Sequence, residues 1–572
     1  MGKEVVSREA RFITHVPTKS YDIPDVHLVK ERINYVDGTH DNEIRIIKDF
    51  KRKFWMTRPA KRDHKQKREY EKIENLLEYE CTQSQLRNQV AKCLGVHSQR
   101  ATLKDLSESP YLYGSDIPAS SFIKAIYAQK YPSCNMSPYT VCNFDTETDM
   151  LHGTKDIIIV SLSYGKRSIV FIERAFLDGV SEPEVKLREY ADKHIGKDLA
   201  EKGMEPTQFV IVERKIDLLI QSFKLIHDWK PDFLAIWNEK FDIGKIIDLC
   251  AKEGIDPRDI LCDPSIPKEY RIFKFKPGLE KQVTASGKVK PVKPANQWHQ
   301  VELSASFFVI DAMCTYRRLR LSDAELPSYS FDSILERHKV AGKLYVEEVE
   351  NLPGERKHIV MQSKYKIEYV IYAAWDTIGM TLLDDITKDI SNSFPSGAAF
   401  SDFNKFNSMP YKIADAFFHY AIKQGYILGT VGKNQKVDIS EDTLEYDGEA
   451  EDEEDEDAPL TILSLKNWIC TLKSYLSELG GDFAIDSKDI RTLFRAFVYD
   501  SDETSAYPNG ILTLNISKRT TKRELIGIDG VAESLFRRQN LNLVIGETNA
   551  IEYCVNMFGF DTPDQLLAEM MA

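Results

Sequence analysis

Hydrophobic residues follow an ordered series of strand and helix patterns from residue 136 to residue 392. Short runs dominated by apolar residues, typical of buried strands, lie at 139–144, 156–164, 167–173, 233–237 and 307–310. Apolar residues recur at helical spacing over 213–228, 243–252 and 365–389. Three strands followed by helix, strand, helix, strand and helix predict one mixed α/β domain within a multidomain α+β chain.

The segments on either side predict three further domains. Residues 1–135 mix short strands with a charged helix near 66–79. The run Phe394-Pro395-Ser396-Gly397 is typical of a domain exit, so 393–494 is predicted to be a helical connector with an acidic loop at 441–457. The apolar run 496–500 opens a last section, 495–572. Inside the α/β domain, residues 284–300 are rich in Lys and Pro and predict a projecting loop or hairpin.

Composition narrows the class of protein. The nine cysteines form no C-x-x-C pair, which indicates a reducing compartment without a disulfide framework or a structural zinc site. No run approaches the roughly 18 apolar residues of a membrane span, and the polar start lacks a secretory hydrophobic stretch. We therefore expect a cytoplasmic protein with no membrane partner.

The net charge of −13 does not exclude DNA, because much of the acidity lies in one segment. Residues 442–457 are mostly acidic, and the chain without them is close to neutral. A basic segment near the start is either the solvated face of a helix or a patch that follows a nucleic-acid backbone, with Phe54 and Trp55 for stacking. Its basic residues are Lys51, Arg52, Lys53, Arg58, Lys61, Arg62, Lys65, Lys67 and Arg68.

Two acids follow the first predicted strand of the α/β domain. Asp145 and Glu147 are two residues apart, so alternation along the strand points both carboxylates to one face. Asp242 follows the strand at 233–237, where ligand sites of α/β sheets form. Tyr372 and Asp376 are four residues apart on a predicted helix and share a face. Such oxygen ligands suit Mg²⁺ or Mn²⁺.

These motifs resemble, in the same order, the DEDDy 3′–5′ exonucleases of family B DNA polymerases. The matching patterns are D-x-E at 145–147, N-x2-F-D at 238–242 and Y-x3-D at 372–376. Residues 311–316 and 326–335 are similar to the strand and helix that precede the third motif in phage polymerases. The resemblance implies a ribonuclease H-like exonuclease domain at 136–392, a polymerase-type N-terminal domain at 1–135, and hydrolysis of the 3′-terminal phosphodiester of DNA by two metal ions about 4 Å apart.

The resemblance also implies a role for each residue. Asp145 would bridge the two metal ions, while Glu147, Asp242 and Asp376 complete their ligand shells. Tyr372 would orient the attacking water. Asn238 and Phe241 would support the strand terminus or the DNA end, although Asn238 is equally suited to be a cap or turn residue.

The last section resembles the first palm motif of the same polymerases. Ser501-Asp502-Glu503-Thr504-Ser505-Ala506-Tyr507-Pro508 is similar to D-x2-S-L-Y-P, with Ala506 in place of the usual leucine. By this resemblance Asp502 binds the catalytic Mg²⁺ and Tyr507 packs under the incoming sugar. A proline-terminated strand turn is the simpler alternative.

Other polymerase motifs are missing from the sequence. No finger helix reading K-x3-N-S-x-Y-G occurs, and the only D-T-D lookalike, 561–564, contains a proline that is incompatible with a tight palm hairpin. We therefore expect the N-terminal subunit of a split, phage-type polymerase acting in an infected bacterial cell. Its expected partners are a single-stranded 3′ end, primer-template DNA and a second subunit with fingers, remaining palm and thumb; a sliding clamp is a further candidate.

Three alternatives stay open. The chain could be a free-standing exonuclease with a vestigial palm segment. It could be a non-enzymatic nucleic-acid-binding regulator that uses the basic segment. It could also be a piece of a longer enzyme.

Overall fold

The protein divides into two compact units, residues 1–437 and 438–572. The computed structural model describes residues 3–18, 24–68, 70–96, 101–131, 138–283, 289–321, 323, 325–340, 346–349, 352–393, 418–429, 437–438, 544–545 and 548–549. In the second unit these include the short antiparallel pair β21 (Val544–Ile545) and β22 (Thr548–Asn549). The acidic loop and the palm-like motif with Asp502 and Tyr507 lie outside the described residues.

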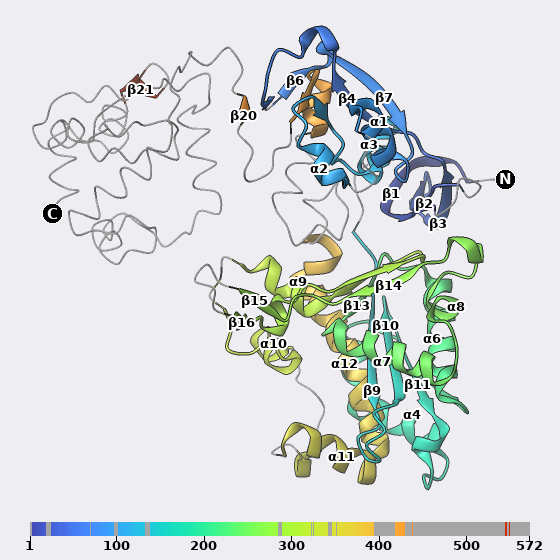
Figure 1. Cartoon of the computed structure of the whole chain (residues 1–572). Helices are drawn as coiled ribbons and strands as arrows, with labels where there is room; N and C mark the ends of the chain where they lie inside the picture. The colour runs from blue at the N-terminus through green and yellow to red at the C-terminus, as the bar shows by residue number, and fades with distance from the viewer. Residues whose placement is uncertain are drawn as a thin grey trace, which may run out of the picture. The chain divides into compact units, whose positions relative to one another are not determined.

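A six-stranded mixed sheet forms the centre of the α/β part of the first unit (Figure 1). Its order is β12-β11-β10-β9-β13-β18, and five strands run in one direction while β10 runs in the other. The strands are β9 (Val141–Thr148), β10 (Ile157–Tyr164), β11 (Arg167–Glu173), β12 (Gln208–Val212), β13 (Phe233–Ile236) and β18 (Phe308–Asp311). The predicted mixed α/β class is thereby confirmed, with β12 as an unpredicted edge strand.

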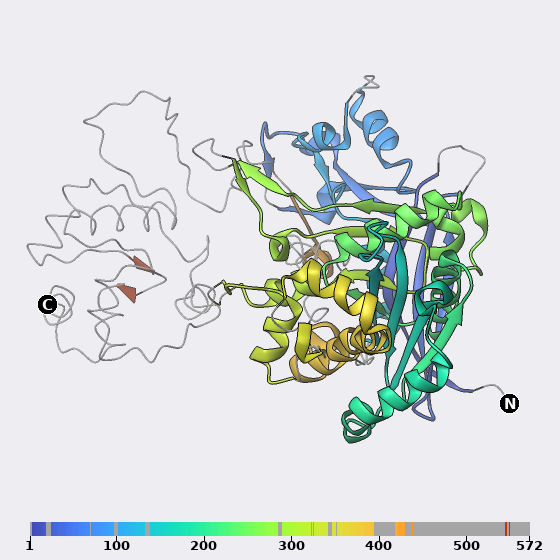
Figure 2. The same cartoon turned by 90° about the horizontal axis from the view of Figure 1, so that it is seen from below.

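Helices cover both faces of this sheet (Figures 1 and 2). The first group is α6 (Lys215–Trp229), α7 (Glu239–Lys252) and α8 (Pro257–Leu261). The second group is α4 (Pro183–His194), α5 (Gly196–Glu201), α10 (Phe331–Arg337), α11 (Gly354–Lys364) and α12 (Lys366–Thr387). Side chains of β9 alternate between the two layers: Phe144 packs on Phe223 of α6, whereas Asn143 bonds Thr381 of α12.

Helix α12 packs across β9, β10 and β11 because nearly its whole length is apolar. Its single glycine, Gly379, lies where α10 approaches, and a Cβ there would be 3.2 Å from the ring of Phe331. The helix ends at Thr387 and is followed by Lys388, whose φ of 55° is left-handed. Because the helix is buried against these strands, its packing determines which of its polar residues contact the sheet.

The N-terminal part consists of small sheets and short helices. Its strands are β1 (Val5–Val16), β2 (Val26–Tyr35), β3 (His40–Lys48), β4 (Arg52–Thr57), β5 (Lys67–Arg68), β6 (Tyr70–Lys72), β7 (Leu76–Cys81) and β8 (Leu112–Tyr113). Its helices are α1 (Leu86–Leu94), α2 (Leu103–Ser107) and α3 (Ala119–Lys130). The strands β1-β2-β3 form one antiparallel sheet, and β7-β4-β8 form another.

The predicted charged helix near 66–79 is wrong. Strands β5, β6 and β7 occupy this stretch, and β7 pairs antiparallel with β4. In β7 the exposed Glu78 and Glu80 alternate with less exposed residues, as is typical of a strand. The many charged residues of this stretch hid that alternation in the sequence.

The basic segment near the start is not a helix, and its two aromatic rings are not available for stacking. Phe54 and Trp55 lie in the hydrophobic core and are at most 2% exposed, so neither ring is available for base stacking. Arg52 and Lys67 are also buried, where they donate to backbone carbonyls of residues 114, 115 and 107. Arg52, Lys67 and both aromatic rings therefore serve the fold. The other basic residues are exposed or half-buried, so contact of this segment with a nucleic-acid backbone stays a prediction.

A buried ionic network joins the N-terminal sheet to the central sheet within the first unit. Asp232, which precedes β13, forms an ion pair with Lys30, whose Nζ is 3.1 Å from Oδ1, and accepts a hydrogen bond from Arg32 Nη2 at 2.7 Å. It also accepts from the backbone N–H of Thr140 at 2.8 Å. All three charged side chains are buried, and the two cations hold the pKa of Asp232 at about 2 despite its burial.

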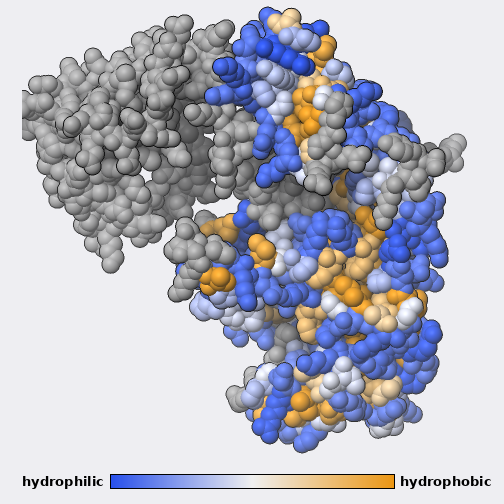
Figure 3. All heavy atoms as spheres, in the orientation of Figure 1, coloured by the Kyte–Doolittle hydropathy of each residue, from blue (hydrophilic) through white to orange (hydrophobic). Residues whose placement is uncertain are grey.

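Several smaller elements complete the described chain. These are β14 (Phe273–Lys276), β15 (Lys281–Val283), β16 (Val289–Pro291), β17 (Gln300–Leu303), α9 (Ala312–Leu319), β19 (Tyr426–Leu428) and β20 (Val437–Asp438). Strands β15 and β16 pair antiparallel, in line with the hairpin expected near 284–300. Among the described helices, none is long and apolar enough to cross a membrane. Hydrophilic residues cover much of the face of the first unit drawn in Figure 3, with smaller hydrophobic groups between them.

Candidate functional site

Asp145 and Glu147 lie on the part of β9 that extends beyond its neighbour β13. The parallel pairing of these strands ends with Ile236 opposite Phe144, so residues 145–148 have no β13 partner. Both acids point to the α12 side of the sheet, because they alternate with Phe144 and Thr146. The two carboxylates therefore lie beyond the end of the shorter strand.

Asp376 of α12 completes a compact acidic group. Asp145, Glu147 and Asp376 each offer a carboxylate oxygen, and these oxygens all lie within 4.8 Å of one another. Glu147 and Asp376 are buried and Asp145 is half-buried. Three carboxylates this close repel one another unless cations neutralise them, and hard oxygen donors of this kind suit Mg²⁺ or Mn²⁺. The group could hold a metal ion.

Hydrogen bonds to the sheet fix the position of α12 along β9. The Oγ1 of Thr381 accepts from Asn143 Nδ2 at 2.8 Å and lies 2.8 Å from Ser163 Oγ on β10. Asn143 is two residues before Asp145, and Thr381 is five residues after Asp376. This contact sets which turn of the helix faces the acids.

The Glu147 carboxylate has a hydrogen-bond donor that the sequence analysis missed. The hydroxyl of Tyr369 donates to Glu147 Oε2 at 2.5 Å. Burial and the negative charge of Glu147 raise the pKa of Tyr369 well above its ordinary value, so the phenol keeps its proton and remains a donor. The available signal was spacing, since Tyr369, Tyr372 and Asp376 share one face of α12.

Tyr372 is 2% exposed and lies directly beside Tyr369. The two rings stack, with centroids 5.6 Å apart and planes 10° from parallel. His358 of α11 meets both rings edge-on, at 5.8 Å and 5.9 Å. The predicted tyrosine is therefore held in an aromatic group next to the acidic residues.

Asp242, in the first turn of α7, contacts the same strand beyond the end of its pairing with β13. Its Oδ1 accepts from the backbone N–H of Thr146 at 3.0 Å and from Thr146 Oγ1 at 2.6 Å. It is not a member of the group of three oxygens within 4.8 Å of one another. Burial raises the pKa of Asp242 to about 7, so a nearby cation would strongly favour its ionised form.

Two more acids lie at the ends of the neighbouring strands. Asp311 caps α9 through the N–H of Cys314 at 2.8 Å and also accepts from the N–H of Glu239 at 2.9 Å. Glu239 is completely buried, and neither of its carboxylate oxygens has a hydrogen-bond partner among the described residues. Burial and the proximity of Asp311 raise the pKa of Glu239 well above its ordinary value.

Asn238 and Phe241 are both exposed, Asn238 at the turn before α7 and Phe241 in the first turn of this helix. Asn238 has a left-handed backbone, with φ of 72°, and its side chain makes no cap hydrogen bond. The residue is therefore a turn residue, and Asp311 caps the first N–H of the helix instead. Phe241, which precedes the buried Asp242, is 44% exposed and offers an apolar surface there.

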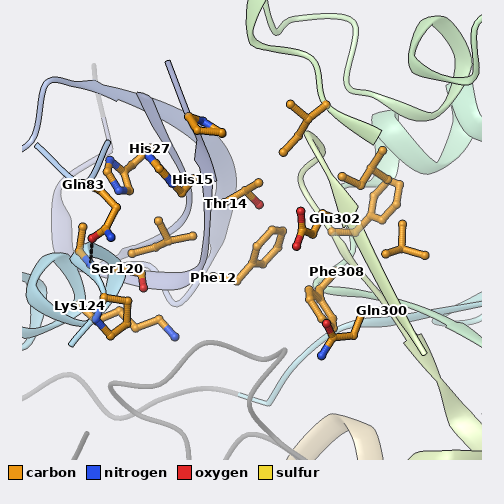
Figure 4. Close-up of a pocket in the computed structure, with 18 residues that line it drawn as sticks. Phe12, Thr14, His15, His27, Gln83, Ser120, Lys124, Gln300, Glu302 and Phe308 are labelled. Atoms are coloured by element: carbon orange, nitrogen blue, oxygen red, sulfur yellow. Dashed lines mark hydrogen bonds between the residues drawn. The ribbon is translucent and has the colours of Figure 1, made fainter. Parts of the chain in front are cut away.

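A separate cavity of about 340 Å³ lies elsewhere in the first unit (Figure 4). It is lined by β1, β2, α3 and β17 residues that include His15, His27, Lys124 and Glu302. None of the predicted site residues lines it.

Asp502 and Tyr507, the residues predicted for a polymerase site, lie outside the described residues. No protein-family model matches the chain, and a search of curated proteins finds no similar sequence. Of the predicted site residues that the structure describes, Asp145, Glu147 and Asp376 converge, Tyr372 stacks on a neighbour of Glu147, and Asp242 contacts the same strand.

Proposed function

We propose that the first unit is a metal-dependent 3′–5′ exonuclease that acts on single-stranded ends of DNA. The observation that carries the proposal is the convergence of Asp145, Glu147 and Asp376 from β9 and α12, with carboxylate oxygens within 4.8 Å of one another. Their motifs occur in the same order as in the DEDDy exonucleases of family B DNA polymerases, and this resemblance is the reason for proposing 3′–5′ hydrolysis of DNA. The sheet order β11-β10-β9-β13-β18 with one antiparallel strand supports a ribonuclease H-like fold for this part.

In this proposal each residue has a distinct task. Asp145, Glu147 and Asp376 hold divalent cations, and Asp242 joins them once it is ionised. Bound Mg²⁺ or Mn²⁺ would supply a water of lowered pKa and neutralise charge on the leaving 3′-oxygen. The Tyr372 hydroxyl orients the attacking water, and the exposed ring of Phe241 stacks on the terminal base.

Digestion of an end-labelled oligonucleotide tests the proposal. The protein should shorten single-stranded DNA from the 3′ end with Mg²⁺ or Mn²⁺ and stop in EDTA. Asp145→Ala and Asp376→Ala should each lower the rate by a factor on the order of 10³ or more, because each removes a metal ligand. Asp385→Asn is the matched control, since this exposed acid lies on the same helix outside the group. Digestion that survives Asp376→Ala would contradict the proposal.

We further propose that this exonuclease is the proofreading part of a split, phage-type family B DNA polymerase. The resemblance of residues 501–508 to the first palm motif supports this, as does the lack of the finger and D-T-D motifs in the sequence. A second polypeptide would supply fingers, the remaining palm and the thumb. Asp502 would bind the polymerase metal ion, and Tyr507 would discriminate against ribonucleotides.

Primer extension separates this wider proposal from a free-standing exonuclease. The chain should extend a primer only with a partner that carries the missing motifs, and Asp502→Ala should abolish that extension while leaving digestion intact. Extension by the chain alone, or no extension with any such partner, would contradict the split-polymerase proposal.

A further inference from the structure

Gln362 of α11 uses every hydrogen-bonding position of its amide. Its Oε1 accepts from the backbone N–H groups of Met150 and Leu151, each at 2.9 Å. Its Nε2 donates to the carbonyl of Thr148 at 2.8 Å and to the hydroxyl of Tyr369 at 3.1 Å. Because the two backbone N–H groups need an acceptor, the orientation of the amide is fixed.

This side chain therefore clamps the chain where β9 ends. Thr148 is the residue after Glu147, and Met150 and Leu151 follow it. Gln362 is 1% exposed, so its four hydrogen bonds form in a poorly solvated environment where losing one is costly. The clamp holds Glu147 from the backbone side.

The hydroxyl of Tyr369 connects the clamp to the Glu147 carboxylate. A phenol has one proton and two lone pairs, and here the proton goes to Glu147 Oε2. One lone pair accepts from Gln362 Nε2. His358 Nδ1, 2.9 Å from the same oxygen, must then be the donor to the other lone pair, which assigns its Nδ1–H form.

We infer that His358, Gln362 and Tyr369 are positioning residues that set the orientation of the Glu147 carboxylate for metal binding and, through the stacked ring, the place of Tyr372. The inference rests on the proposed function, because it assigns these residues to the same metal site. None of the three is a member of the acidic group. Hydrogen-bonded partners of metal ligands typically change metal affinity about 10- to 100-fold when removed.

The variant Tyr369→Phe tests this inference. It keeps the ring that stacks on Tyr372 and removes only the hydroxyl that bonds Glu147. Tyr316→Phe is the matched control, because that buried hydroxyl lies 2.8 Å from His338 Nε2, another tyrosine–histidine contact. Each variant loses one tyrosine–histidine hydrogen bond, but only Tyr369→Phe also loses a hydrogen bond to Glu147.

Mn²⁺ titration of the full chain by calorimetry provides the readout. We expect the Mn²⁺ Kd of Tyr369→Phe to rise by about 10-fold or more while the Kd of Tyr316→Phe stays at the wild-type value. The Mg²⁺ concentration for half-maximal digestion should rise in parallel, and kcat should recover at saturating Mg²⁺. A residue with a merely structural role would lower the melting temperature without moving the Kd.

The outcomes separate this inference from the proposed function. If wild type binds Mn²⁺ and Asp145→Ala does not, but Tyr369→Phe binds as tightly as wild type, the inference fails and the proposed function stands. If wild type and Asp145→Ala bind Mn²⁺ equally, the proposed function itself fails. Should Tyr369→Phe not fold, His358→Ala takes its place, because this side chain is 28% exposed. Its loss leaves the hydrogen bonds of the Tyr369 hydroxyl with Gln362 and Glu147 in place. A wild-type Kd in His358→Ala would then overturn the inference.

Discussion

Buried carboxyl groups in this protein differ in whether the fold supplies them with partners. Asp311 and Asp242 accept hydrogen bonds from backbone and hydroxyl donors, whereas Glu239 lies fully buried with no hydrogen-bond partner among the described residues. A buried charge without partners costs free energy, so Glu239 takes up a proton more readily in the folded state than in the unfolded state.

Glu239→Gln should therefore stabilise the protein at high pH. For an acid whose pKa is raised on folding, stability is lost as pH rises above its unfolded pKa of about 4.3, and the neutral amide escapes that loss. As pH rises from 5 to 8, we expect the free energy of unfolding of the variant to increase by about 1–3 kcal/mol relative to that of wild type. Urea unfolding at both pH values measures this gain. The control is Glu253→Gln on the exposed end of the same helix, and an equal pH response in both variants would contradict the assignment.

At the scale of elements, α12 determines which residues meet β9. Tyr369, Asp376 and Thr381 of this helix lie against alternate residues of that strand. Thr381 also links the strand to its neighbour, because its hydroxyl bonds both Asn143 and Ser163. Removing its hydroxyl leaves the side chains of Asn143 and Ser163 without this partner next to a buried helix.

Thr381→Val should lower the free energy of unfolding by about 1–3 kcal/mol, because valine preserves the shape and leaves buried polar groups unsatisfied. Thr387→Val is the comparison, since that hydroxyl bonds the Leu383 carbonyl of its own helix near the helix end. Chemical denaturation of both variants measures the difference. An equal effect of the two substitutions would show that the contact with β9 does not fix α12.

The sequence predicted the elements whose signal is local. Apolar runs located β10, β11 and β13 within one or two residues, and helical spacing located α6 and α12. The charged stretch around β5, β6 and β7 was mistaken for a helix, because strand pairing such as β6 with β19 and β7 with β4 is a long-range property. The motifs placed Asp145, Glu147 and Asp376 correctly together, whereas Tyr369 and Gln362 carry no motif, and their contacts depend on how α11 and α12 pack on β9.

For the first unit as a whole, the ion group around Asp232 joins the N-terminal sheet to the sheet that carries the acids. Its carboxylate is buried beside Lys30 and Arg32, and loss of the negative charge would leave these cations uncompensated in a region shielded from water. Breaking a buried pair in this way typically costs about 3–5 kcal/mol.

Asp232→Asn should show that cost at neutral pH and change the response to acid. The folded pKa of Asp232, about 2, lies below its unfolded value, so its contribution is present above about pH 4 and is lost as pH falls toward 2. This pH-dependent contribution of Asp232 to stability amounts to about 2 kcal/mol, and the asparagine variant should lack it. Unfolding measured from pH 6 to pH 2 tests the difference, with the exposed Asp228→Asn as control. Parallel acid profiles in wild type and Asp232→Asn would contradict this account.

The central claim is that Asp145, Glu147 and Asp376 together hold a divalent metal ion. Anomalous diffraction from crystals of the full chain soaked in Mn²⁺ tests it most directly. The account predicts a manganese peak at coordination distance, about 2.0–2.3 Å, from carboxylate oxygens of all three residues, and no peak there in Asp145→Ala. A Mn²⁺-soaked wild-type crystal with no peak between these three carboxylates, or an unchanged peak in Asp145→Ala, would contradict it.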